Sequence, residues 1–433
     1  MKFLNIGGAC GVLENKGKRI LFDPWLENGI MNNSWFHYPP ITSSINDISK
    51  VDYIYISHIH EDHCHADTLR MLSRDAEIIL MDRGPEIPNF VMRFLNANKL
   101  SFKKVHLIKP WTPSLINGEF MVDMLTADPD HEYNYLVDSA AIIKWDGVTI
   151  YNSNDCSPYK YSIEYIKKTY GKVNLALLPY SGGSAYPGCY SNLSHEEKLA
   201  EKDRIAQASI SKFIDDCAQL QPELVMPFAD QYVIGGSMSA INKYLPHPPC
   251  PGSMQAYIEK NLPVQKLLLL NPGQAYDFET GNKVPDIPYI FHTDEQRKTY
   301  INGLADHKYG HEVITIRDSV TIPRILTAAR NRLWEIQKRQ NNFPDYIIYF
   351  SLSDKQETYK IDLKEADVEF NPDILGQEFG HRPYLKISLT STLLVMTLIN
   401  HIPWNMSEAF MDFYRAPNIF NKEVYALLNN LII

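Results

Sequence analysis

Short apolar runs that end in polar turns recur through the first half of the chain. Runs of this kind, rich in β-branched and aromatic residues, are typical of buried strands. The spacing of Leu69 and Leu72 predicts a helix over residues 66–74, so strands and helices alternate as they do in layered α/β folds. The predicted strands cover residues 2–6, 18–22, 51–56, 77–81, 107–110, 120–127, 140–145, 148–151 and 173–179.

Two local signals predict where elements turn or begin. Asp146 and Gly147 separate two of the predicted strands and are typical of a tight hairpin turn. Ser194, followed three positions later by Glu197, predicts a helix that starts with a capping box. His195 then lies at the helix N-terminus, and we interpret it as a surface residue rather than a ligand.

Residues 28–48 hold several aromatic and proline residues without a clear period, which predicts a long ordered loop. Such a loop forms either a lid or wall of a site, or an aromatic-packed surface segment, and the sequence leaves both open.

From about residue 285 the pattern changes, so we expect two domains, residues 1–284 and 285–433. Leu326, Ala329 and Leu333 predict one apolar helix face over residues 321–340. Residues 346–352 and 358–363 alternate like a hairpin, and residues 385–402 and 422–431 form further strands or helices. We therefore predict a small C-terminal α+β domain or appendage, which walls a pocket, forms a dimer interface or holds a partner.

Composition limits the class of protein. A chain of 433 residues with 45% hydrophobic and 21% charged residues is typical of a globular protein. Its net charge of -9 and the lack of a Lys/Arg stripe argue against a nucleic-acid backbone partner. The six cysteines form no Cys-x-x-Cys pair, which favours reduced thiols over a disulfide framework or a zinc ribbon.

A signal peptide or a membrane span in the sequence would bear on the compartment that we expect. The first residues run into Gly7 and Gly8 without the apolar segment that a signal peptide needs. Apolar runs stay below the roughly 18 residues of a membrane span. We therefore expect a cytoplasmic protein with no membrane partner.

The polar stretch after the predicted strand 51–56 carries the strongest chemical signal. His58, His60, Asp62 and His63 place three imidazoles and a carboxylate within six residues. In an extended segment His58 and His60 point the same way, and the following turn aims Asp62 and His63 at a neighbouring ion. The alternative is a solvated loop whose histidines cluster by chance, but the stretch favours a site for one or two divalent metals.

Other strand ends add candidate ligands. His131 follows the predicted strand 120–127, where a third ligand for the first metal is needed, and Asp128 and Asp130 compete for that role. Asp155 follows the predicted hairpin and is placed to bridge two metals or to bind the second. Asp230 follows a further strand candidate that begins near residue 223, and it is the ligand type nearest to that strand end.

The pattern His-x-His-x-Asp-His resembles the signature of the metallo-β-lactamase superfamily. The resemblance implies an αββα sandwich of two mixed sheets flanked by helices, with metals at the sheet edge. It also implies that Asp23, which otherwise only caps a turn, orients the histidine ligands from outside the coordination sphere. Residues 1–284 would then form the metal-binding catalytic domain.

Five segments in this order resemble the catalytic part of CMP-N-acetylneuraminate hydroxylases. They are residues 22–26, 56–63, 154–156, 181–183 and 227–229. Pro227-Phe228-Ala229 stands where most hydrolases of the superfamily carry their last histidine, so oxygen ligands dominate and iron or manganese is favoured over zinc. The hydroxylases also carry a Rieske domain with Cys-x-His pairs. This sequence shows no such pair, so the resemblance implies an external electron-donor protein.

Three functions follow from the predicted site. The first is a monooxygenase, with iron favoured, that hydroxylates a polar or nucleotide-linked small molecule. The second is a metal-dependent hydrolase of an ester, thioester, amide or phosphodiester. The third is a binding scaffold that the metal only stabilises. Asp62 is the candidate for proton handling or for binding the second metal in either enzyme, and the sequence leaves homo-oligomer formation open.

Overall fold

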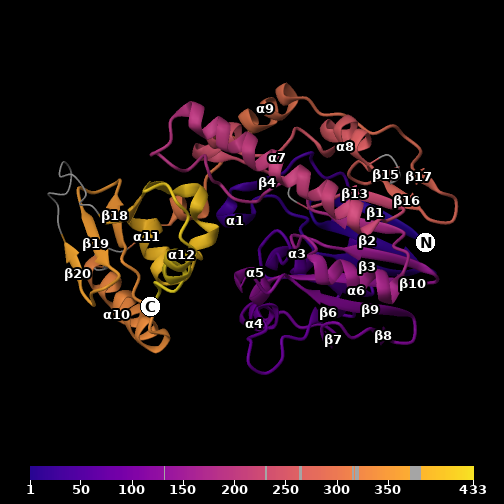
Figure 1. Cartoon of the computed structure of the whole chain (residues 1–433), viewed down its shortest axis with the longest axis horizontal. Coiled ribbons are helices and arrows are strands. Elements are labelled where there is room, and N and C mark those ends of the chain that lie inside the picture. Colours follow the sequence, from indigo (N-terminus) through magenta and orange to yellow (C-terminus); the bar gives the residue numbers. More distant parts are fainter. Residues whose placement is uncertain (131, 230–231, 263–265, 315, 317–320, 371–381) are drawn as a thin grey trace.

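The computed structural model describes residues 1–130, 132–229, 232–262, 266–314, 316, 321–370 and 382–433. Two large sheets carry helices on their outer faces, and a smaller sheet with its own helices lies toward the C-terminus (Figure 1). His131 and Asp230, two of the predicted metal ligands, lie outside the described residues.

The first sheet has eight strands, mixed in direction. In spatial order they are β17 (Asn282–Val284), β16 (Ala275–Asp277), β1 (Lys2–Gly7), β2 (Cys10–Asn15), β3 (Lys18–Phe22), β5 (Tyr53–Tyr55), β6 (Glu77–Met81) and β7 (Lys104–Ile108). From β3 to β7 all neighbours run parallel, so their C-terminal ends lie at the same edge of the sheet.

The second sheet has seven strands. In spatial order they are β15 (Lys266–Leu267), β13 (Leu224–Pro227), β12 (Leu175–Leu178), β11 (Val148–Asn152), β10 (Ser139–Trp145), β9 (Phe120–Thr126) and β8 (Ser114–Ile116). β10 runs antiparallel to β9 and β11, so its first residue lies at the same edge as their last residues.

The two sheets enclose a common hydrophobic core. Phe22 and Tyr55 from the first sheet and Val122, Ile143 and Leu177 from the second belong to this core. Residues at even spacing along each strand face inward, because side chains alternate across a sheet. Removing this much apolar surface from water stabilises the sandwich at about 25 cal/mol per Å².

Helices cover the outer faces. The first sheet packs against α3 (Ala66–Met71) and α4 (Phe90–Ala97), and the second packs against α6 (Lys160–Tyr170), α7 (His195–Leu220) and α8 (Gln255–Asn261). α5 (Glu132–Val137) precedes β10, and α9 (Asp294–Gly303) follows the first sheet in sequence. The predicted αββα arrangement is confirmed.

The predicted capping box is also confirmed. Ser194 Oγ accepts a hydrogen bond from the backbone N–H of Glu197 at 3.2 Å, and Glu197 Oε2 accepts from the backbone N–H of Ser194 at 2.7 Å. These two bonds satisfy donors that the first helical turn leaves open. His195 is exposed, as expected for a surface position.

The prediction of a long ordered loop over residues 28–48 was wrong in part, because short helices and a strand interrupt it. The segment contains α1 (Ile30–Asn33), β4 (Trp35–His37) and α2 (Ile45–Ile48). β4 pairs with β14 (Tyr232–Ile234), and the ring of Trp35 stacks on that of Tyr232 with centroids 3.4 Å apart. The partner strand is far away in sequence, so no local pattern announces the pairing.

The third large sheet lies in the C-terminal part of the chain. Its strands, in spatial order, are β20 (Val368–Phe370), β19 (Thr358–Asp362), β18 (Ile347–Leu352), β21 (Tyr384–Leu389) and β22 (Asp412–Ala416). α10 (Ile322–Gln340), α11 (Ser391–Leu398) and α12 (Lys422–Asn429) pack against them. The predicted hairpin and the helix before it are confirmed, while the boundary near residue 285 stays a prediction.

A segment between β12 and α7 pairs with the C-terminal sheet. The backbone N–H of Phe413 in β22 donates to the carbonyl oxygen of Cys189, and that of Ser191 donates to the carbonyl oxygen of Phe413, both at 2.8 Å. Trp25 and Tyr190 belong to the same hydrophobic core as the C-terminal strands. The C-terminal sheet and the sandwich therefore share buried surface.

Glu77, the first residue of β6, links the two sheets of the sandwich. Its carboxylate accepts from Asn117 Nδ2 at 2.8 Å and contacts His106 Nε2 at 2.7 Å and Lys103 Nζ at 3.0 Å. Burial alone would raise the pKa of Glu77, but these hydrogen bonds lower it from 4.5 to about 2.

Because the pKa of Glu77 is lower in the folded state, its ionised form stabilises the fold above pH 4.5, and this contribution is lost as the pH falls toward about 2. We expect the Glu77→Gln variant to be less stable than the native chain near neutral pH and the difference to shrink with acidification. Urea denaturation across this range measures it. Glu335→Gln, which removes only an exposed pair with Lys338, is the matched control. A gap that is independent of pH would contradict the assignment.

Two further expectations are tested by the structure. All six cysteines are free and buried, as predicted for reduced thiols. Within the described ranges, helices long and apolar enough to cross a bilayer are absent.

Candidate metal centre

The histidine motif lies in the loop that follows β5, at the edge where the parallel strands of the first sheet end. β5 is held between β3 and β6, so the chain leaves the sheet at a fixed point. The backbone N–H groups of His63 and Cys64 donate to the carbonyl oxygen of His60 at 3.0 and 2.8 Å. This turn folds His63 back toward His58, and the centroids of the two rings lie 4.1 Å apart.

Two groups of side chains at this edge have metal-ligand geometry. His58, His60 and Asp138 form one, and His58, His63 and Asp155 form the other, with the ligand atoms of each group within 4.8 Å of one another. His58 is common to both. The structure therefore brings together four of the predicted residues from two sheets.

The distances show how compact the arrangement is. His58 Nε2 lies 2.8 Å from His60 Nδ1, 3.8 Å from Asp138 Oδ1 and 3.7 Å from Asp155 Oδ2. His63 Nε2 lies 3.3 Å from both Asp155 Oδ2 and Asp62 Oδ2. Asp62, the predicted catalytic residue, thus borders the second group without belonging to either three-residue set.

Asp23 supports the loop from beneath. Its Oδ1 accepts from the backbone N–H of Ser57 at 2.7 Å, and its Oδ2 accepts from Ser57 Oγ at 2.8 Å and lies 2.9 Å from His63 Nδ1. With Nδ1 engaged by Asp23, the Nε2 of His63 is the nitrogen that faces Asp155. The contact fixes the orientation of the His63 ring, and the role of Asp23 toward a metal stays a prediction.

Burial and the neighbouring carboxylates shift the pKa values of His58 and His63 in opposite directions. Burial lowers the pKa of His58 well below its ordinary value, so this ring is neutral and able to bind a metal. Burial alone would lower the pKa of His63 too, but the carboxylates of Asp155, Asp62 and Asp23 raise it well above its ordinary value. The carboxylates therefore stabilise a cation at this position, which a metal ion would also supply.

Asp138 is a site residue that sequence reasoning missed. It directly precedes β10, and the antiparallel register carries it to the edge where β11 delivers Asp155. Burial, followed by repulsion from Asp155, raises the pKa of Asp138 to about 8. The sequence contained a signal for Asp138. Asp155 was predicted as a ligand because it lies next to a predicted strand, and Asp138 likewise lies next to the strand that begins near Ala140.

The guanidinium of Arg83 fixes the backbone around Asp138. It donates to the carbonyl oxygens of Tyr135 at 2.8 Å and Asp138 at 2.9 Å, and also to that of Val137. These bonds hold the end of α5 against the first sheet and so position the Asp138 carboxylate.

Some predicted candidates are not brought to the centre. Asp128 Oδ1 accepts from the backbone N–H of Asp130 at 3.0 Å, and neither carboxylate belongs to a metal-ligand group among the described residues. His131 and Asp230 stay predictions, because they lie outside the residues that the structure describes.

The C-terminal part of the chain contacts the candidate centre, which agrees with one of the three roles that the sequence left open for it. Asn405, in the short helix η5 (Trp404–Met406), places its Nδ2 3.4 Å from His60 Nε2. Glu408, in η6 (Glu408–Phe410), accepts a hydrogen bond from Ser184 Oγ at 3.1 Å. Both contacts join residues more than 200 positions apart.

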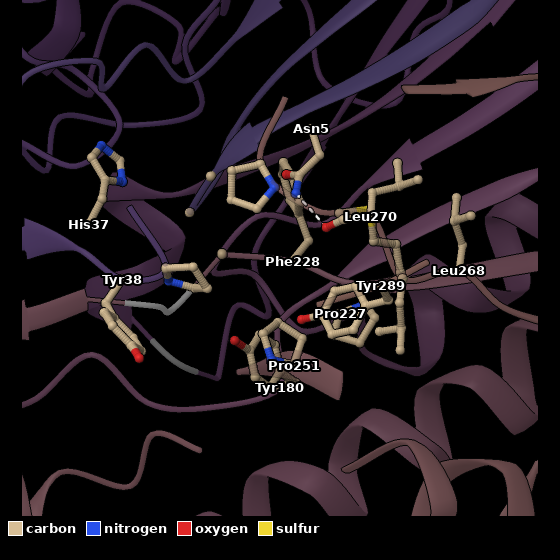
Figure 2. A pocket seen from close by; sticks show the side chains of 17 residues that line it. Asn5, His37, Tyr38, Tyr180, Pro227, Phe228, Pro251, Leu268, Leu270 and Tyr289 are labelled. Atoms are coloured by element: carbon tan, nitrogen blue, oxygen red, sulfur yellow. Dashed lines mark hydrogen bonds between the residues drawn. The ribbon is translucent and has the colours of Figure 1, made fainter. Parts of the chain in front are cut away.

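A small pocket of about 40 Å³ lies near the same sheet edge. Its lining includes Gly7, Gly8 and Ala229, and Figure 2 shows Tyr180 and His37 among the surrounding side chains. The backbone N–H of Ala229 donates to the carbonyl oxygen of Gly8 at 3.1 Å, which closes the sheet edge at this point. The pocket has room for ordered water rather than for a substrate.

Comparison with known proteins finds relatives that are similar to part of this chain. It is 29% identical over 241 residues to the cytidine monophosphate-N-acetylneuraminic acid hydroxylase of Cricetulus griseus, covering 52% of this chain and 39% of the hydroxylase. It is 28% identical over 197 residues to a putative Rieske 2Fe-2S iron-sulfur protein of Mycolicibacterium smegmatis, covering 44% of this chain and 36% of that protein. The chain therefore spans less than two fifths of the length of these two relatives.

A solved structure, the metallo hydrolase Igni18 from Ignicoccus hospitalis, aligns with a TM-score of 0.43 at 19% identity, over 64% of this chain and 98% of that one. Residues 3–229, just over half of the sequence, match the family described as the Beta-lactamase superfamily domain, and the chain therefore belongs to that superfamily.

Proposed function

We propose that the chain is a metal-dependent, monooxygenase-like enzyme, with iron favoured, that hydroxylates a polar or nucleotide-linked small molecule with electrons from a separate protein. The observation that carries the proposal is the mixed carboxylate and imidazole set at the sheet edge. With Asp62, which lies 3.3 Å from His63 Nε2, the set contains as many carboxylates as imidazoles, and such a share of oxygen ligands suits iron or manganese better than a site dominated by imidazole or thiolate. The relative named as a hydroxylase supports the same reaction class.

The residues present fit a metal. Asp138 Oδ1 and Asp155 Oδ1 are buried, and neither has a hydrogen-bond partner within the described part of the chain. Buried carboxylate oxygens without partners are costly, because burial removes their hydration. A cation among them would restore the lost interactions, while the neutral His58 offers its free electron pair.

We assign His58, His60 and Asp138 to one ion and Asp62, His63 and Asp155 to a second. His58 belongs to both geometric groups, but a single Nε2 binds one ion, so Asp62 completes the second set. Iron at this centre would supply the dioxygen and one-electron chemistry that side chains do not provide. Asp23 fixes the ring of His63, and Arg83 fixes the backbone at Asp138.

The side chains around the centre have further roles in this proposal. Burial alone would raise the pKa of Asp62, but the interactions with His63 help to bring it below its ordinary value. The carboxylate therefore stays ionised and is able to accept a proton. Asn405 borders His60, because its Nδ2 lies 3.4 Å from His60 Nε2. The alternative function is a hydrolase, favoured by the ionised Asp62 carboxylate beside His63, which would take a proton from an attacking water.

The identity of the metal tests the proposal. Protein purified anaerobically without added metal is expected to hold about two irons per chain, as in two-metal sites. Its Mössbauer spectrum should change when reductant and then oxygen are supplied. Zinc or manganese that does not respond to oxygen would contradict the oxygenase and favour the hydrolase, to be screened with esters and phosphodiesters.

A further inference from the structure

A cleft of about 980 Å³ lies between α7, α8, α9 and the 3-10 helix η1 (Gly236–Tyr244). Figure 1 shows α7, α8 and α9 gathered on one side of the sandwich. A volume of this size accommodates a small organic ligand. Tyr180 lines both this cleft and the small pocket of Figure 2, so the cleft adjoins the loop that follows β12 at the sheet edge.

Positive charge dominates the walls of this cleft. Lys202, Lys243, Arg297 and Lys298 line it, against the two carboxylates of Asp203 and Asp294. Within the described residues, the four cationic groups form no salt bridge. In a chain with a net charge of -9, a local excess of unpaired cations is unexpected for an ordinary surface.

Arg297 is the most informative of these residues, because it is only 8% exposed. Its Nη1 donates to the carbonyl oxygen of His247 at 3.3 Å. Its Nε and Nη2 are buried and have no hydrogen-bond partner among the residues that the structure describes. A buried guanidinium with unsatisfied N–H groups is costly unless an acceptor reaches it.

Hydrogen bonds hold His247, whose carbonyl oxygen accepts from Arg297, in a fixed position. His247 Nε2 lies 2.8 Å from the carbonyl oxygen of Gly182, and its Nδ1 lies 3.2 Å from that of Tyr232. Burial lowers the pKa of His247 to about 4, so this ring is neutral and adds no charge of its own. The guanidinium therefore rests on a fixed and uncharged support.

We infer that this cleft binds the anionic group of a small molecule, a phosphate or a carboxylate, with Arg297 as the buried anchor and the three lysines at its rim. A planar guanidinium matches both groups, because each offers two oxygens to its paired N–H donors. The inference is independent of the proposed reaction, since binding is measured on protein without metal.

Isothermal titration calorimetry of metal-free protein with inorganic pyrophosphate and, separately, with succinate tests the inference. Binding of either anion is expected, and the one that binds more tightly identifies the class of group. The Arg297→Gln variant should bind at least about tenfold more weakly, because a charge-assisted hydrogen bond is lost. Lys260→Met, an exposed lysine of α8 outside the lining, should bind like the native chain.

A second variant leaves the buried Arg297 in place, so that a loss of binding cannot result from misfolding around that residue. Lys243→Met combined with Lys298→Met changes two exposed side chains and should weaken binding about tenfold while leaving thermal stability unchanged. Failure of both anions to bind at roughly millimolar concentration, which marks weak ligands, would overturn the inference. Equal affinity in the native chain and in both variants would overturn it as well.

Discussion

The His58→Ala variant is expected to lose the ion of the first group, which is about half of the native metal content. His58 is the one residue common to both metal-ligand groups, and its neutral ring lies within 3.8 Å of the two carboxylates that line them. Affinity for the first ion should fall by more than about a hundredfold, because even residues outside the coordination sphere contribute ten- to hundredfold. Elemental analysis of protein reconstituted with iron measures the loss.

His106→Gln is the matched control for this variant. His106 lies in β7, its Nε2 contacts the carboxylate of Glu77 at 2.7 Å, and it belongs to neither ligand group. It should retain the native metal content. His60→Ala should lose the ion of the first group only. Native metal content in His58→Ala and His60→Ala together would rule out the assigned ligands.

The Asp138→Asn variant should have opposite effects on metal binding and on the stability of metal-free protein. Metal content should fall by about one ion per chain, because an amide is a far weaker ligand than a carboxylate. Without metal, the melting temperature near neutral pH should rise, because burial raises the pKa of Asp138 to about 8, so folding must protonate this carboxyl, a cost that the amide does not carry. Calorimetric melting of both forms separates a ligand from a merely structural residue.

Asp123→Asn serves as the comparison for Asp138→Asn. Asp123 is also buried, but its Oδ2 accepts hydrogen bonds from Tyr165 at 2.6 Å and Tyr170 at 2.9 Å. Its replacement should leave the metal content unchanged, because Asp123 belongs to neither metal-ligand group. A drop in stability for metal-free Asp138→Asn, with metal retained, would show that Asp138 only supports the fold.

The sequence predicted those parts of the fold that local signals determine. β6 begins and ends as predicted, the Asp146-Gly147 hairpin forms, and Ser194 caps its helix. Each of these depends on residues within a few positions of one another. The αββα arrangement followed from the order of such elements together with the family resemblance.

Features that depend on distant partners were beyond local reasoning. β4 forms only because β14 pairs with it, and Asp138 reaches the centre only through the antiparallel register of β10. Asn405 arrives from the C-terminal part of the chain, and the cleft around Arg297 joins α9 to α7. Among the predicted ligands, His58, His60, His63 and Asp155 are brought together, whereas His131 and Asp230 stay predictions.

The pairing of residues 189–191 with β22 has a consequence for how this protein can be divided. Removing the C-terminal sheet from the chain would expose Trp25 and Tyr190 to solvent. It would also leave backbone groups of Cys189 and Ser191 without their hydrogen-bond partners. A recombinant fragment limited to the sandwich would expose an apolar, strand-like edge, which is a common starting point for aggregation. Gene fusions and domain exchanges should therefore keep the sandwich and the C-terminal sheet together.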